Sequence, residues 1–221
     1  MTDLAIYDMD RTVTRHATYT PFLLYCAAHR SPARLALVPL AALSMLAYAA
    51  KAIDRGRLKE INHRLLLGHR RSAQELAPLV AGFARQTLAG NVRPGALAAI
   101  ARDKAEGRRV VMATASYRLY AKGIADALGF DDCIGTNAII GLDERVHAKI
   151  DGANCYGPAK LTMIEDWLKR EGITRGHVRF YSDHASDAPV FDWANEAVAV
   201  NPHAPLRALA EARGWRVKDW G

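Results

Sequence analysis

Ile6-Tyr7-Asp8-Met9-Asp10-Arg11-Thr12 is the stretch that decides the fold of this chain. Apolar residues that favour strands run into two carboxylates spaced i, i+2, and a hydroxyl side chain follows two residues later. A buried parallel strand delivers such groups to its C-terminal edge, where ligands bind in open α/β sheets. The spacing therefore predicts a nucleophile, Asp8, and an acid/base group, Asp10, at a sheet edge. A solvated turn is the simpler alternative.

The closeness of Asp8 and Asp10 also points to a metal ion. Two unscreened carboxylates raise each other's pKa unless a cation lies between them. Mg²⁺ prefers hard oxygen ligands and keeps water or substrate phosphate oxygens in its shell. It is therefore the simplest ion to expect at this position.

Composition narrows the class of protein. Half of the 221 residues are hydrophobic and the net charge is +7, which favours anionic partners: phosphorylated metabolites, acidic lipid surfaces or nucleic acid. The three cysteines are far apart, so a disulfide framework or zinc site is not expected and a reducing compartment fits. The first residues lead directly into the first predicted strand, so we expect no secretory signal. We expect a cytoplasmic protein, with peripheral contact to the inner membrane as a further hypothesis.

Five short apolar runs, each followed by turn or polar residues, predict buried strands, as in a parallel sheet covered on both faces. They are residues 3–8, 108–114, 132–136, 177–182 and 196–200. Helical patterns separate the later runs, and Gly129, Gly172 and Gly214 are placed to end helices. The predicted fold class is α/β, with a Rossmann-like parallel-sheet core.

The first connection is far longer than one crossover requires. About 100 residues lie between Asp10 and the next strand, whereas a crossover needs about a dozen. Apolar residues recur there at helical spacing, and Ser72-Ala-Gln-Glu75 is a candidate capping box. We therefore predict a helical cap at 15–92, inserted into a catalytic core formed by 1–14 and 93–221.

Three further motifs fall beside predicted strand ends or helix starts. Thr114-Ala115-Ser116 places a hydroxyl beside main-chain amides that open a helix, which makes a phosphate cradle, although such residues are common at any N-cap. Lys160 follows Gly157-Pro158 at another helix start, where most lysines are simply solvated. Asp183 and Asp187 follow the fourth strand, where a lone acidic pair is more often a helix cap.

Together, the four motifs resemble the haloacid dehalogenase-like superfamily of phosphohydrolases, and the cap resembles that of the phosphoserine-phosphatase-like subfamily. The resemblance implies that Asp8 forms an aspartyl-phosphate and binds Mg²⁺ through its other oxygen. Asp10 would protonate the leaving alkoxide and then activate water, while its main-chain carbonyl binds the metal.

The same resemblance implies supporting roles for the later motifs. Asp183 would complete the metal site, and Asp187 would support it, with Thr12 as a further supporting residue. The phosphoryl oxygens would be held by Thr114, Ala115 and Lys160. Transport ATPases that share this nucleophile carry threonine at the position of Asp10, so the aspartate favours hydrolysis to free phosphate.

Two departures from the family pattern concern the substrate. Arg11 stands where glycine is common, which is compatible with a right-handed turn and places a cation near the site. Phosphoserine phosphatases typically carry a glutamate five residues beyond the motif's threonine, and here that residue is Ala17. Phosphoserine phosphatase therefore stays as an alternative to a phosphatase for another small-molecule or lipid-precursor phosphate.

The cap contains one unusual apolar segment, Leu35 to Ala50, with Arg30 and Arg34 before it and Lys51 and Arg55 after it. Its sixteen residues span about 24 Å as a helix, short of a hydrocarbon core of roughly 30 Å. We therefore expect either a helix buried within the cap or peripheral membrane contact through 33–52.

A rival of another class is a basic membrane- or nucleic-acid-binding module without activity. Nucleic-acid binding favours a basic stripe with interleaved aromatic residues. Here the cations are dispersed and the four tryptophans lie late in the chain, so no nucleic acid is expected.

Overall fold

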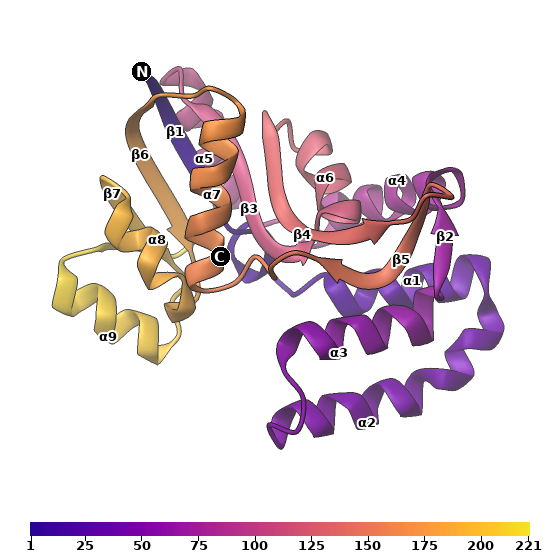
Figure 1. Ribbon diagram of the computed structural model, residues 1–221. Coiled ribbons are helices and arrows are strands. Elements are labelled where there is room, and N and C mark those ends of the chain that lie inside the picture. Colours follow the sequence, from indigo (N-terminus) through magenta and orange to yellow (C-terminus); the bar gives the residue numbers. More distant parts are fainter.

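The computed structural model describes residues 1–221 and has a central eight-stranded sheet in the order β2-β5-β4-β3-β1-β6-β7-β8 (Figure 1). Six strands run parallel: β1 (Thr2–Tyr7), β3 (Arg109–Tyr117), β4 (Asp132–Ile140), β6 (Arg175–Ser182), β7 (Glu196–Val200) and β8 (Arg216–Lys218). Two join antiparallel, β5 (Arg145–Asp151) and β2 (Arg70–Ser72). The predicted α/β class and all five predicted strands are confirmed, whereas β2, β5 and β8 were not predicted.

β1 lies at the centre of the sheet because both of its faces are apolar. Leu4 and Ile6 pack on one side and Ala5 and Tyr7 on the other, all without exposed surface. The first side is covered by α7 (Pro158–Arg170), α8 (Ala188–Trp193) and α9 (Ala204–Arg213). The second is covered by α4 (Ala73–Gly90), α5 (Pro94–Ala105) and α6 (Arg118–Ala127). Asp8 therefore leaves the sheet between β3 and β6.

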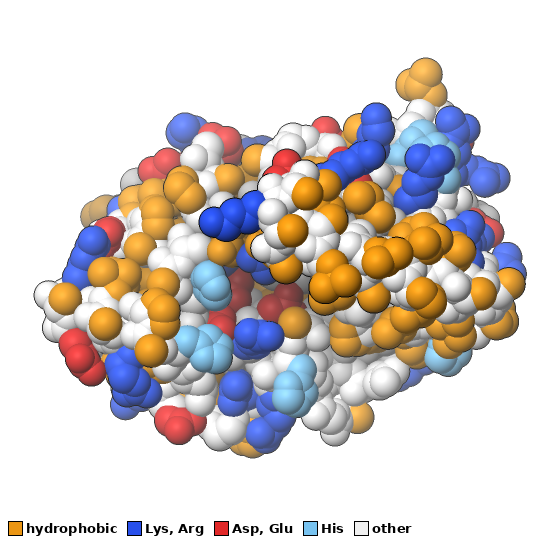
Figure 2. Space-filling view, turned by 90° about the horizontal axis from the view of Figure 1, so that it is seen from below, with side chains coloured by type: hydrophobic (Ala, Val, Ile, Leu, Met, Phe, Trp, Pro, Cys, Tyr) orange, Lys and Arg blue, Asp and Glu red, His pale blue; other side chains and the backbone are white.

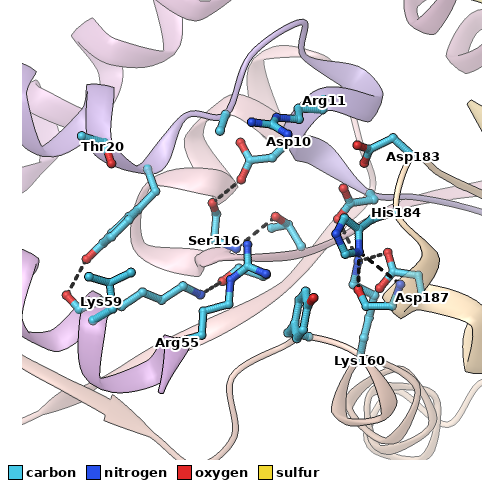
Figure 3. Close-up of a pocket in the computed structure, with 18 of the residues that line it drawn as sticks. Asp10, Arg11, Thr20, Arg55, Lys59, Ser116, Lys160, Asp183, His184 and Asp187 are labelled. Atoms are coloured by element: carbon cyan, nitrogen blue, oxygen red, sulfur yellow. Dashed lines mark hydrogen bonds and ion pairs between the residues drawn. The ribbon is translucent and has the colours of Figure 1, made fainter. Parts of the chain in front are cut away.

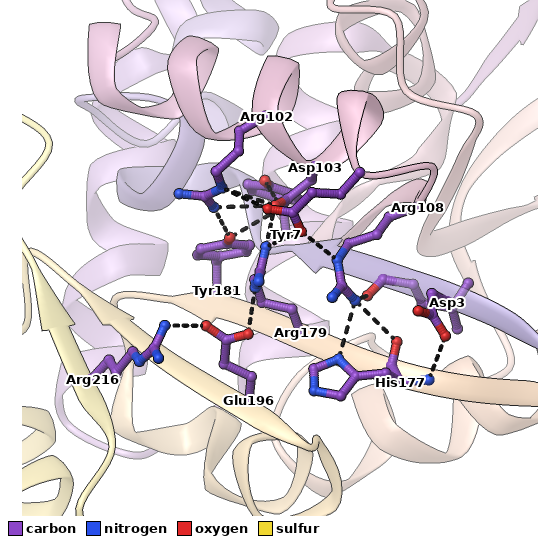
Figure 4. Close-up of polar contacts among 12 residues, drawn as sticks. Asp3, Tyr7, Arg102, Asp103, Arg108, His177, Arg179, Tyr181, Glu196 and Arg216 are labelled. Atoms are coloured by element: carbon purple, nitrogen blue, oxygen red, sulfur yellow. Dashed lines mark hydrogen bonds and ion pairs between the residues drawn. The ribbon is translucent and has the colours of Figure 1, made fainter.

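A buried polar cluster ties the central strands to α5 (Figure 4). The rings of Tyr7 and Tyr181 stack at 4.3 Å, and both hydroxyls donate to Asp103, to which Tyr181 Oη lies at 3.0 Å. Arg179 pairs with Asp103 at 2.5 Å and with Glu196 at 2.6 Å. Because Asp103 has no exposed surface, its charge needs these partners. The cluster holds β1 beside β6 near the C-terminal ends of both strands, which Asp8 and Asp183 follow.

The helical insertion leaves the core through a narrow neck. Thr14 pairs with Val92 in an isolated antiparallel bridge, and Arg93 N donates to Val13 O beside it. Between these points lie α1 (Tyr19–Arg30), a 3₁₀ turn (Pro32–Leu37), α2 (Val38–Ala49), α3 (Arg55–Asn62), a π-turn (His63–Leu67), β2 and α4. β2 extends the sheet and α4 packs on α6, so α1 to α3 form the part that projects over the sheet edge (Figure 1).

Several local signals are confirmed. Ser72 and Glu75 form the predicted capping box, with each side chain accepting from the other's main-chain N–H, at 3.2 and 3.0 Å. The three glycines placed at helix ends have positive φ, and Gly214 takes the left-handed cap after α9.

The alternative that α2 is buried within the cap is wrong. Only Ala41 and Ser44 of this helix are buried, and its large apolar side chains face outward. The stretch Pro32–Ala49 is also the one helix that is long and apolar enough to cross a membrane by length and composition. An all-apolar helix gives no periodic signal for which face is covered, so the sequence left both alternatives open.

Candidate active site

The predicted site residues meet in one cavity of about 320 Å³ at the C-terminal edge of the sheet (Figure 3). Its floor comes from the ends of β1, β3 and β6 and the start of α7, which contribute Asp8, Asp10, Thr114, Ala115, Lys160, Asp183 and Asp187. Its opposite wall comes from α1, α2 and α3. The cavity therefore lies between the sheet edge and the inserted helices.

Asp8 and Lys160 form a buried ion pair at the floor. Lys160 Nζ lies 2.8 Å from Asp8 Oδ1 and 2.6 Å from Asp187 Oδ2, and its side chain is 2% exposed. Burial raises the pKa of Asp8 to about 7 against the opposing effect of Lys160. Burial alone would lower the pKa of Lys160, but Asp187 and Asp8 together raise it, so this ammonium stays charged. Ser182 Oγ donates to Asp187 at 2.7 Å and fixes the second carboxylate.

Thr12 joins Asp8 to Asp183. Its hydroxyl is 3.1 Å from Asp183 Oδ1 and 3.4 Å from Asp8 Oδ2, and it accepts from Asp183 N at 3.0 Å. Burial raises the pKa of Asp183 as well. Two buried carboxylates thus share one hydroxyl. The structure contains no group of three or more His, Cys, Asp or Glu side chains that could hold a metal ion, so a metal here would need other oxygen ligands.

Asp10 is held by three donors on the cavity floor. Thr18 N and Thr18 Oγ1 both donate to Oδ1 at 2.7 Å, and Ser116 Oγ donates to Oδ2 at 2.6 Å. Tyr120 in turn donates to Ser116 Oγ at 2.6 Å. These bonds fix the direction of the Asp10 carboxylate, as a general acid requires for a positioned proton transfer.

The last residues of β3, after Thr114, form one side of the floor. The pairing of β3 with β4 shifts between Thr114 and Tyr117, and Ser116 N donates to Thr114 Oγ1 at 3.1 Å. This irregularity turns Ala115 and Ser116 into the cavity just before α6 begins at Arg118. An anion on this side would meet a hydroxyl and a helix N-terminus.

The expected right-handed turn at Arg11 is wrong. Arg11 has φ 64° and ψ −6°, a left-handed conformation that favours glycine. The loop is anchored to β6 before this turn, where Asp8 N donates to Tyr181 O, and within the turn Arg11 N donates to Thr14 Oγ1. The Arg11 side chain is exposed and lines the cavity.

The cap wall carries two cations. Lys59 is 6% exposed, and its ammonium donates to Ala115 O and, at 2.5 Å, to Asn154 Oδ1. Burial, together with the neighbouring charge of Arg55, lowers the pKa of Lys59 to about 7. The Arg55 guanidinium lies 4.3 Å from the centre of the Tyr156 ring.

The arrangement agrees with comparisons to known proteins. The family of haloacid dehalogenase-like hydrolases matches residues 5–192. The chain belongs to this family. It is 26% identical to the "Inhibition of morphological differentiation protein" of Streptomyces azureus over 98% of this chain and 78% of that protein. It is 27% identical to a histidinol-phosphatase of Neisseria meningitidis over 68% of this chain and 69% of that protein. It is 33% identical to phosphoserine phosphatase SerB1 of Mycobacterium tuberculosis, over 52% of this chain and only 37% of SerB1.

Two solved structures share the fold. A Bordetella pertussis protein of unknown function matches with a TM-score of 0.89 at 25% identity, covering 100% of both chains. A phosphoserine phosphatase, solved as a phospho-aspartyl intermediate analogue, matches with a TM-score of 0.62 at 16% identity, covering 94% of this chain and 90% of that one.

Two residues that line the cavity, Ser116 and Lys59, and a third that holds Asp10, Thr18, have contacts that the sequence did not predict. Ser116 lies within a motif singled out for phosphate binding, but its bond to Asp10 was not expected. Thr18 and Lys59 gave no separate signal, because a threonine before a helix and a lysine within one are usually solvent-exposed.

Proposed function

We propose that this enzyme is a Mg²⁺-dependent phosphomonoesterase that works through an aspartyl-phosphate on Asp8, with a small-molecule or lipid-precursor phosphate as substrate. The observation that carries the proposal is the pairing of Asp8 with Lys160 at 2.8 Å, with Thr12 and Asp183 on the other side of Asp8. Asp10 lies in the same cavity and is oriented by hydroxyl donors.

The charges of the floor support a divalent cation. Asp8, Asp183 and Asp187 are buried; Lys160 pairs with Asp8 and Asp187, whereas no cation pairs with Asp183. Burial raises the pKa values of Asp8 and Asp183, which supports a further positive charge beside these two carboxylates. These carboxylates and the main-chain carbonyl of Asp10 would hold Mg²⁺, with water or substrate oxygens completing its shell. When bound, the ion supplies neutralisation of the phosphoryl charge.

The chain's own residues account for each step. A carboxylate oxygen of Asp8 attacks phosphorus while the bond from phosphorus to the alcohol oxygen breaks, and Asp10 gives its proton to the leaving oxygen. Asp10 then takes a proton from a water molecule that attacks the aspartyl-phosphate, which releases phosphate and frees Asp8. Lys160, Thr114 and Ala115 hold the non-bridging oxygens, so catalysis is mainly positioning and charge stabilisation.

The cap wall favours a leaving group without an ammonium ion. Phosphoserine carries an amine, and the only carboxylates lining the cavity are the four aspartates of the floor. Ala17, Arg55 and Lys59 stand on the cap side, where an amine would need an acid. Phosphoserine therefore remains the less favoured alternative, even though relatives of the same family carry that name.

Release of phosphate from p-nitrophenyl phosphate distinguishes the proposed phosphatase from its rival, a membrane- or nucleic-acid-binding module without activity. We expect turnover that requires Mg²⁺, stops with EDTA and is lost in Asp8→Asn. Asp166→Asn makes the same chemical change on an exposed aspartate and should keep activity. Turnover in Asp8→Asn, or none in the wild type with Mg²⁺, contradicts the mechanism. The three free cysteines are buried, which fits the cytoplasm as the proposed location.

A further inference from the structure

The outward side of α2 is an apolar surface in a cap otherwise rich in cations. Leu43 is 58% exposed and Leu46 is 66% exposed. We call the whole set of exposed side chains the α2 face: Leu35, Val38, Leu40, Leu43, Met45, Leu46 and Tyr48. Figure 2 shows it as a broad hydrophobic area beside a hollow that contains acidic side chains. Soluble monomers rarely expose contiguous apolar surfaces of more than a few hundred Å² unless they bind something.

The orientation of α2 is fixed by its inner side. Ala41 and Ser44 face the rest of the cap, and Ser44 Oγ donates to Asn62 Oδ1 of α3 at 2.9 Å. Ser44 Oγ is also 2.7 Å from Ala41 O. Turning the helix to bury its leucines would break the buried contact between Ser44 and Asn62, so the apolar side is held outward.

The charge around the α2 face has one sign. From Arg11 to Ile53 the chain has five basic residues and no Asp or Glu. The whole insertion, 15–92, has eleven Lys and Arg against three Asp and Glu, a net of +8, so the rest of the chain carries −1 of the total of +7. An apolar helix face set among cations complements a surface of anionic head groups over acyl chains. Two copies of this face would instead bring two strongly positive insertions together.

The α2 face is continuous with the cavity. Met45 is 52% exposed and also lines the cavity, together with Leu58 and Pro21 from α3 and α1. Asp8 and Lys160 lie at the floor of the same cavity. An apolar chain attached to a phosphate at the floor would leave along Met45 toward the α2 face.

We propose that the α2 face docks on an anionic lipid membrane and that the substrate is a membrane-borne amphiphilic phosphomonoester. This inference rests on the proposed phosphatase activity. The helix lies along the surface: its 12 residues span about 18 Å, less than a hydrocarbon core of roughly 30 Å. The leucines enter the acyl boundary, the flanking arginines and lysine meet lipid phosphates, and the cavity opens toward the head groups.

The test measures vesicle binding and turnover in the same preparations. Sedimentation with vesicles of phosphatidylglycerol and phosphatidylcholine, and with phosphatidylcholine alone, gives the partition coefficients. The variant Leu43→Glu/Leu46→Glu removes apolar contact and adds repulsion. Neither residue lines the cavity, so turnover of p-nitrophenyl phosphate should be unchanged. Leu97→Glu makes the same substitution on an exposed helical leucine of the core. Turnover of phosphatidic acid in the anionic vesicles is measured in parallel.

We expect the wild type and Leu97→Glu to bind anionic vesicles, and the double variant to bind at least about tenfold more weakly and to lose phosphatidic acid turnover in proportion. A wild type that hydrolyses p-nitrophenyl phosphate but does not bind anionic vesicles overturns the membrane inference and leaves the phosphatase proposal intact. A dimer that the double substitution dissociates, without vesicle binding, assigns the α2 face to a second copy and also overturns it. Failure to hydrolyse p-nitrophenyl phosphate with Mg²⁺ overturns the phosphatase proposal itself, whatever the vesicles show.

Discussion

Replacing Lys160 with methionine isolates the electrostatics of the cavity floor. Methionine has a similar length and keeps the apolar stem, so the change removes mainly the ammonium ion. That ion lies 2.8 Å from Asp8 and 2.6 Å from Asp187, and its side chain is 2% exposed. Removing one member of a buried ion pair leaves an uncompensated charge and typically costs about 3–5 kcal/mol. We expect Lys160→Met to lower the free energy of unfolding by an amount in this range and to abolish phosphatase activity.

The loss in free energy of unfolding caused by Lys160→Met should depend on pH in a definite direction. Burial already raises the folded-state pKa of Asp8 to about 7, and loss of Lys160 removes a contribution that lowers it. An aspartate whose folded pKa exceeds its unfolded value binds a proton more readily when folded, so stability rises as the pH falls through the folded pKa. The cost of Lys160→Met should therefore be largest above about pH 7 and shrink in acid.

Urea unfolding in EDTA, followed by circular dichroism, measures these differences. Lys122→Met is the matched control, because Lys122 pairs with Asp126 at 2.7 Å on the surface, where such pairs contribute about 0–1 kcal/mol. Lys160→Met/Asp187→Asn should regain part of the loss, because it removes one of the stranded charges. If Lys160→Met costs no more than Lys122→Met, the floor is not held by a buried ion pair and the electrostatic reasoning fails.

Three smaller changes test other parts of the site. Ser116→Ala removes one donor to Asp10 and should lower kcat about tenfold with little change in KM; an unchanged kcat would show that this bond does not orient the acid. Lys59 loses its charge as the pH rises through about 7. Over that range the wild type should show a rising KM for phosphoglycolate, an ester that carries a carboxylate, relative to its KM for p-nitrophenyl phosphate. Lys59→Met should show no such rise. Equal profiles would remove Lys59 from substrate binding. Arg11→Gly should change the free energy of unfolding by less than about 1 kcal/mol, whereas Arg11→Val, which is β-branched at a positive φ, should cost about 1–2 kcal/mol; equal urea midpoints would contradict the strained turn.

The features that the sequence predicted are those set by neighbouring residues. The apolar run before Asp8 is buried on both sides, which is why it predicts a central parallel strand. The capping box at Ser72 and the positive φ of Gly214 likewise depend on residues within one turn. The carboxyl ends of parallel strands share one edge, so Asp8 and Asp183 could be expected to meet without knowledge of the helices between them.

Most of the features that were missed depend on distant partners. β5 is an exception, because it alternates polar and apolar residues, the local pattern of a half-buried strand, whereas the prediction rested on continuous apolar runs. Lys59 is buried because Asn154 and Ala115 receive its ammonium, and both come from other parts of the chain. The loop that contains the left-handed Arg11 is anchored to β6, where Asp8 N donates to Tyr181 O. Local propensity predicts none of these contacts.

The floor and the wall of the cavity differ in charge and in the part of the chain that forms them. The floor combines buried carboxylates with one buried ammonium, and its chemistry requires fixed geometry, so its residues lie directly at or beside the ends of central elements. The wall comes from the insertion, whose net charge of +8 and exposed apolar helix contribute nothing to phosphoryl transfer itself. A core with a net charge of −1 does not attract an anionic substrate from a distance, whereas a positive insertion over the site does. We therefore propose that α1 to α3 select the substrate, while the sheet edge carries out the proposed phosphoryl transfer.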